Sequence, residues 1–67
     1  MNYEELLDFM TNGYEHGTES ENREYLASEF GLKEYQINNL MISAILFTSP
    51  ISTDEGVQLI KDLIKGR

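Results

Sequence analysis

Cysteine is absent from this chain of 67 residues, and that absence limits how so short a chain can hold itself together. A domain of this size buries only about 60% of the surface that its unfolded chain exposes, so its core is marginal. Small domains compensate with disulfides, a metal, very regular helices or a partner subunit. Disulfides and thiolate metal sites are excluded here, and a single histidine, His16, builds no histidine cluster. Regular helices and association with another chain remain.

Apolar residues recur at helical spacing along the chain, and the alternation that is typical of strands is absent. We therefore expect residues 1–67 to form one all-α domain, a small bundle of about four short helices. The predicted helices cover approximately residues 3–12, 19–30, 33–48 and 53–65. Three capping pairs and one glycine stop mark their ends, namely Asn2 with Glu5, Thr18 with Glu21, Ser52 with Glu55, and Gly31.

The same spacing predicts which side chains face the core. In the first two helices they are Tyr3, Leu6, Leu7, Met10 and Tyr14, then Leu26 and Phe30 beside Ala27. In the last two they are Ile37, Leu40, Met41, Ala44 and Ile45, then Val57, Ile60 and Ile64 with Leu59 and Leu63.

The third predicted helix is apolar on both sides, because no charged residue occurs from Tyr35 to Thr53. At about 100° per residue, Tyr35, Ile42 and Leu46 fall opposite the inward stripe. A helix of this kind is normally buried on both sides. Two interpretations follow. Either this helix is the centre of the core, or its second face packs on another copy of the chain or on a partner.

Acidic residues are concentrated in the first half of the chain, which accounts for the whole formal net charge of −7. An acidic field repels phosphate backbones and attracts basic surfaces. We take the glutamates of the second helix as the candidate partner-binding face, namely Glu19, Glu21, Glu24 and Glu29. The alternative is a charged coat that only keeps a small domain soluble.

Residues 23–40 resemble the core of a helix-turn-helix. The first helix of this motif is the predicted helix of residues 19–30. A small residue, Ala27, lies within it, and Gly31 opens the turn four residues later. The resemblance implies close approach of the two helices at Ala27 and a DNA-reading set on the second helix, namely Lys33, Gln36, Asn38 and Asn39. The basic flanks that hold phosphate are missing, since Arg23 and Lys33 stand among glutamates.

The sequence contains no recognisable catalytic or metal-binding pattern. Residues 8–19 have the length of a calcium loop, but Met10 stands where an oxygen ligand is required. His16 has no cysteine or second histidine beside it, and no serine–histidine–acid set or glycine-rich phosphate loop occurs. We expect a protein that is not an enzyme and that uses neither a cofactor nor a metal.

These observations favour a small acidic regulator or inhibitor that binds a protein with a basic surface. It resembles the tiny acidic domains of phage and mobile-element proteins that block host factors. The alternatives are a dimeric helix-turn-helix DNA-binding regulator and a purely structural assembly protein. No apolar stretch approaches the ~20 residues of a membrane span, and the first residues lack the basic start of a signal peptide, so we expect a cytoplasmic location.

Overall fold

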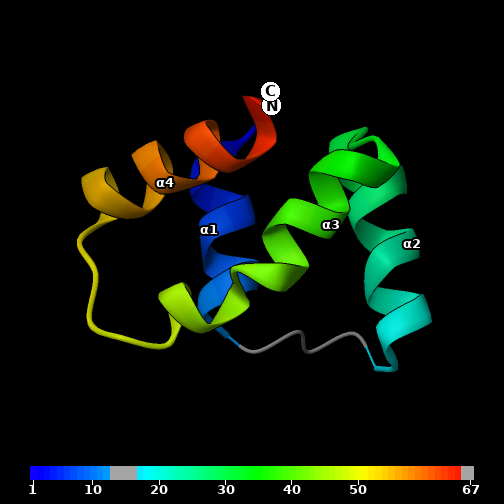
Figure 1. Ribbon diagram of the computed structural model, residues 1–67, viewed down its shortest axis with the longest axis horizontal. Coiled ribbons are helices and arrows are strands. Elements are labelled where there is room, and N and C mark those ends of the chain that lie inside the picture. Colours follow the sequence, from blue (N-terminus) through cyan, green and yellow to red (C-terminus); the bar gives the residue numbers. More distant parts are fainter. Residues whose placement is uncertain (13–16, 66–67) are drawn as a thin grey trace.

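The computed structural model describes residues 1–12 and 17–65 of the chain. Over these residues every regular element is a helix, which confirms the predicted all-α bundle (Figure 1). The elements are α1 (Tyr3–Thr11), α2 (Glu19–Phe30), α3 (Glu34–Ile42), the 3₁₀ turn η1 (Ala44–Phe47) and α4 (Thr53–Lys65). No helix in the described part of the chain is long and apolar enough to cross a membrane.

Local signals in the sequence set the helix ends. The Asn2 side chain accepts a hydrogen bond of 3.0 Å from the backbone N–H of Glu5. Thr18 and Glu21 form a reciprocal capping box at the start of α2, as predicted. Gly31 ends that helix with a φ of 63°, a left-handed conformation that glycine adopts without steric cost.

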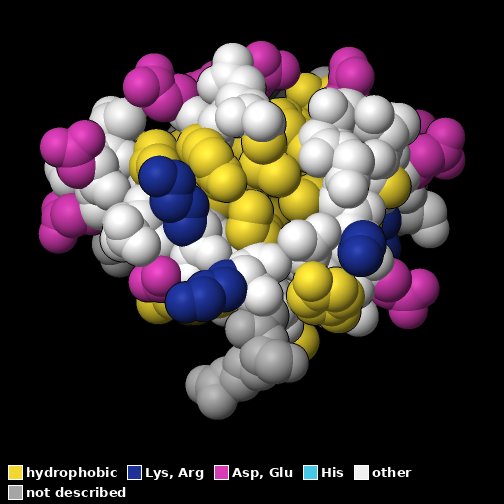
Figure 2. All heavy atoms as spheres, turned by 90° about the horizontal axis from the view of Figure 1, so that it is seen from above, with side chains coloured by type: hydrophobic (Ala, Val, Ile, Leu, Met, Phe, Trp, Pro, Cys, Tyr) yellow, Lys and Arg dark blue, Asp and Glu magenta, His cyan; other side chains and the backbone are white. Residues whose placement is uncertain are grey.

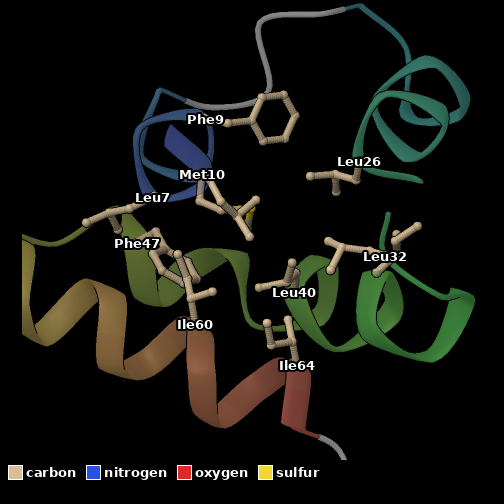
Figure 3. Packing of buried hydrophobic residues seen from close by; sticks show 11 residues of the cluster. Leu7, Phe9, Met10, Leu26, Leu32, Leu40, Phe47, Ile60 and Ile64 are labelled. Carbon is tan, nitrogen blue, oxygen red and sulfur yellow. The ribbon is translucent and has the colours of Figure 1, made fainter. Parts of the chain in front are cut away.

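Helix α3 lies in the middle of the molecule, with α2 on one side and α1 and α4 on the other (Figure 1). Side chains from all four helices and from η1 point toward one common core (Figure 3). The largest fully buried side chains are Leu6, Met10, Leu26, Leu40 and Ile60. Gly56 lets α4 approach α1 closely, because a Cβ at that position would lie 2.5 Å from the Leu7 Cδ1.

The third helix is shorter than predicted, since α3 ends at Ile42 and not near residue 48. Ser43 follows with its N–H directed at the carbonyls of Asn39 and Met41, and a 3₁₀ turn then replaces the α-helix. The turn lays η1 against α1 and buries Phe47, which is 2% exposed. Ile45, predicted to face inward, is 73% exposed as a result.

The predicted close approach of two helices at Ala27 is wrong. Ala27 is exposed, and α2 turns Leu26 and Asn22 toward the interior instead. The glycine turn of the helix-turn-helix pattern is therefore present without the helix contact that its small residue implies. Tyr14, which was predicted to face inward, and His16 are not among the residues that the structure describes.

Candidate interaction surfaces

Four carboxylates from two helices gather around Tyr25. On α2, Glu21 and Glu24 line a shallow pocket together with the Tyr25 ring. Glu5 of α1 and Glu29 lie near enough to act electrostatically on the Tyr25 hydroxyl. All four carboxylates belong to exposed residues, and we call this group of five residues the Tyr25 surface.

An aromatic stack fixes the centre of the Tyr25 surface. The Tyr25 ring lies 5.0 Å from the Phe9 ring of α1 and 5.8 Å from the Phe30 ring, which it meets edge to face. Such ring pairs are favourable beyond the area that they bury. Partial burial of the ring, and then the carboxylates of Glu5 and Glu29, raise the pKa of Tyr25 above 10.0. The hydroxyl therefore stays neutral at physiological pH.

The carboxylate of Glu21 also takes part in the cap at the start of α2. This carboxylate accepts a hydrogen bond of 3.0 Å from the backbone N–H of Thr18. The Thr18 backbone N–H and then the Thr18 hydroxyl hold the pKa of Glu21 below its ordinary value of 4.5. Glu21 is consequently anionic at neutral pH and cannot be replaced without weakening the start of α2.

Glu19 does not join the other three predicted glutamates. Residues two positions apart on a helix lie on nearly opposite sides, so Glu19 and Glu21 face different ways. Glu19 lies 3.9 Å from the Arg23 guanidinium and lines a groove toward Ile42 of α3. The predicted acidic face is thus divided, with Glu21, Glu24 and Glu29 on the Tyr25 surface and Glu19 on the α3 side.

The predicted second face of the third helix is exposed. Tyr35 is 48%, Ile42 80% and Leu46 50% exposed, and Ile45 joins them through the 3₁₀ turn. Tyr35 and Ile42 are seven residues apart, which places them two turns apart on one side of α3, opposite the buried Leu40. We call Tyr35, Ile42, Ile45 and Leu46 the apolar stripe.

The amides of α3, predicted to read DNA, hydrogen-bond to neighbouring helices. Gln36 donates from Nε2 to the carbonyl of Ile64 and Asn39 donates from Nδ2 to the carbonyl of Leu63, both at 2.9 Å. These two carbonyls belong to the last turn of α4, where no backbone N–H of the same helix is available to them. On the other flank, Arg23 donates to Asn38 Oδ1. Lys33 is exposed at the start of α3, where its backbone N–H donates to Gln36 Oε1 at 2.8 Å.

Helix α3 therefore directs its amides toward neighbouring helices, buries Ile37 and Leu40 in the core and exposes Tyr35 and Ile42 to solvent. The apolar periodicity indicated the second face of Tyr35, Ile42 and Leu46 but not the exposure of Ile45, and no pattern in the sequence indicated that the amides cap α4. The amides can cap α4 only because folding brings α3 next to the end of α4, which lies 24 to 28 residues further along the sequence. In the face seen from above, hydrophobic side chains of several elements gather near the centre, and carboxylates lie mainly along the upper, left and right edges (Figure 2).

No family model, no curated protein and no solved structure matches this chain. The described residues also hold no group of three or more histidine or acidic side chains placed to bind a metal ion. The described residues form two exposed surfaces of different character, one anionic and aromatic and the other uncharged and apolar.

Proposed function

We propose that this chain is a small acidic regulator that binds a protein target through its Tyr25 surface. The observation that carries the proposal is the gathering of Glu5, Glu21, Glu24 and Glu29 around one aromatic ring. The target presents a basic surface. Occupying that surface blocks whatever else the target binds there, which gives the chain the action of an inhibitor.

The Tyr25 surface combines an aromatic anchor with anionic neighbours, which suits lysine or arginine side chains of a target. A cation over the face of a tyrosine ring is attracted by the ring, and adjacent carboxylates strengthen the contact. Tyrosine is also enriched among the residues that dominate binding energy at interfaces. The surrounding carboxylates steer the encounter and so mainly set the association rate.

The geometry favours a protein target over DNA. Phosphates are repelled by the Tyr25 surface, and Gln36 and Asn39 would have to release the α4 carbonyls before reading base edges. The chain has five lysine and arginine residues, and near α3 Arg23 and Lys33 stand among glutamates, so the row of basic residues that phosphate contacts require is missing from its sequence. A DNA-binding regulator thus remains an alternative that an experiment can decide.

Affinity capture from an extract of the cell that encodes the chain tests this proposal. The wild-type chain is compared with a Glu24→Gln, Glu29→Gln variant and with an Asp54→Asn, Asp62→Asn control on α4. Both variants remove two negative charges, so they have the same net charge and differ in where that charge is lost. We expect one protein with a basic surface to be retained by the wild type and by the control and to be depleted on the Glu24→Gln, Glu29→Gln variant.

Equal depletion on both variants would show that net charge, and not the Tyr25 surface, governs binding. A parallel DNA retention assay at low salt decides the alternative, because neutralising Glu24 and Glu29 would strengthen DNA binding if DNA were the ligand. DNA retained by the wild type and retained more strongly by the Glu24→Gln, Glu29→Gln variant would contradict the proposal outright.

A further inference from the structure

Asn12 and Gly13 follow α1 in the sequence, and asparagine before glycine is the pair that loses its side-chain amide most readily in proteins. The backbone nitrogen of the second residue attacks the side-chain carbonyl carbon of the asparagine, and glycine leaves that nitrogen unshielded because it has no Cβ. Asparagine is thermolabile for this reason. We infer that Asn12 is a deamidation site, at which the chain acquires a further carboxylate at the end of α1. The inference does not depend on the proposed function, because Asn12 is not part of the Tyr25 surface.

The reaction needs water as its only co-reactant. The backbone nitrogen of Gly13 forms a bond to Asn12 Cγ, and the Cγ–Nδ2 bond breaks. The side-chain nitrogen leaves as ammonia, with the proton that the Gly13 nitrogen gives up, and a cyclic succinimide remains. Water then opens the ring at either carbonyl carbon. Opening at one carbonyl gives aspartate at position 12, and opening at the other gives isoaspartate, in which the side-chain carbons become part of the backbone.

Asn12 lies where its own backbone is least restrained. It is the C-cap of α1 and is exposed, with a ψ of 11° that must change before the next nitrogen can reach Cγ. The Asn12 N–H donates to the Asp8 carbonyl, but rotation about ψ moves only the atoms that follow and leaves this bond intact. The described bond that the side chain must give up is the one of 3.1 Å from Asn12 Nδ2 to Asp8 Oδ1, on the surface.

The other four asparagines do not meet these conditions. Each is followed by a residue with a side chain, namely Tyr3, Arg23, Asn39 and Leu40. Asn22, Asn38 and Asn39 also lie inside α2 and α3, where hydrogen-bonded turns on both sides fix ψ. The Asn2 side chain is held by the Glu5 N–H at the start of α1. These four residues therefore serve as controls within the same chain.

Deamidation of Asn12 weakens the end of α1. The new carboxylate takes the place of an amide that donates to the Asp8 carboxylate, so an attraction becomes a repulsion between like charges one turn apart. The charge is also added at the C-terminal end of a helix, where the macrodipole disfavours it. Phe9 and Met10, in the same last turn, are buried in the core. Loosening this turn consequently lowers the stability of the whole domain.

Mass spectrometry of the purified chain, incubated in mildly alkaline buffer and then cleaved after its glutamates, tests the inference. This cleavage separates Asn2, Asn12 and Asn22 from one another and from the pair in α3. We expect the fragment with residue 12 to gain the mass difference between a hydroxyl and an amino group, while the other fragments stay unchanged. Asn12→Gln should lose the mass gain, because the longer side chain closes its ring far more slowly. Asp8→Ala should speed the reaction, because it frees the Asn12 amide.

Asn12→Asp measures the effect of the new charge on stability. Its melting temperature should be roughly 4–8 °C below that of the wild type, from the like-charge pair and the helix end together. Gln58→Glu is the matched control, because it places the same charge one turn from Asp62, where an amide now donates at 3.1 Å, but in the middle of α4. The control should melt closer to the wild type.

Absence of any mass gain at position 12, under conditions in which a short peptide of residues 10–14 reacts, would overturn the inference. So would a mass gain at any of the other four asparagines before position 12. If Asn12→Asp melts with the wild type, the new carboxylate does not weaken α1, and the stated consequence of the modification is wrong.

Discussion

Replacing Gln36 with alanine tests the structural role of the α3 amides. The Gln36 side chain makes two hydrogen bonds, one from Nε2 to the Ile64 carbonyl at 2.9 Å and one from the Lys33 N–H to Oε1 at 2.8 Å. Each is worth about 1 kcal/mol net, and helix propensity changes little from glutamine to alanine. The expected loss in the free energy of unfolding is therefore about 2 kcal/mol. For a domain of this length, that corresponds to a melting temperature lower by roughly 8–16 °C.

Thermal denaturation followed by circular dichroism measures the effect, with Gln58→Ala as the matched control. Gln58 is exposed, and its amide donates only to the Asp62 carboxylate one turn away, at 3.1 Å. Such a pair on a helix surface is worth about 0.2–0.5 kcal/mol, so the control should melt within a few degrees of the wild type. If Gln36→Ala and Gln58→Ala melt together, the Gln36 side chain does not hold α4, and the arrangement of α3 described above is wrong.

Three further changes test the core, the turn and the acid dependence. Leu40→Asp should abolish the cooperative melting transition, because burying an unpaired carboxylate costs several kcal/mol against a total stability of about 5 kcal/mol. A native melting curve would show that Leu40 does not lie in the centre of the core. Gly31→Ala should lower the free energy of unfolding by about 1 kcal/mol in chemical denaturation, since alanine is strained at a φ of 63°, and an unchanged midpoint would refute that conformation. The pKa of Glu21 is lower in the folded chain than its ordinary value of 4.5, so its stabilising contribution is complete above pH 4.5 and is lost as the pH falls through the lowered value. Glu21→Gln should therefore make the free energy of unfolding less dependent on pH in this range. If the wild type and the variant lose stability equally as the pH falls, the Glu21 carboxylate does not cap α2.

Local chemistry allowed much of the fold to be predicted from the sequence. The caps at Asn2 and Thr18 and the left-handed stop at Gly31 depend on residues within one turn of each other, so their spacing is sufficient to identify them. The prediction for the third helix was wrong at its end. Periodicity alone did not reveal that a turn at Ser43 would direct Phe47 into the core against α1.

The candidate surfaces were harder to predict because they depend on which helices become neighbours. Tyr35 and Ile42 share a face in any helix, so this part of the apolar stripe could be predicted from spacing, whereas Ile45 was predicted to face inward and is exposed. Glu5 is 20 positions from Tyr25 in the sequence, and only the packing of α1 against α2 brings them together. The internal hydrogen bonds of Gln36 and Asn39 could not be predicted either, because the polar face of a helix looks the same whether it meets solvent or another helix.

The most direct test of the proposed function is the rate at which the chain associates with its captured target, measured at low and at physiological salt. The Glu24→Gln, Glu29→Gln variant should associate several-fold more slowly than the wild type at low salt, because those carboxylates steer the encounter. The difference should shrink as salt rises, since exposed charges are screened beyond ~8 Å at physiological ionic strength. The Asp54→Asn, Asp62→Asn control should associate at nearly the wild-type rate at both salt concentrations. Equal association rates for the two variants at low salt would contradict the claim that the Tyr25 surface receives the target.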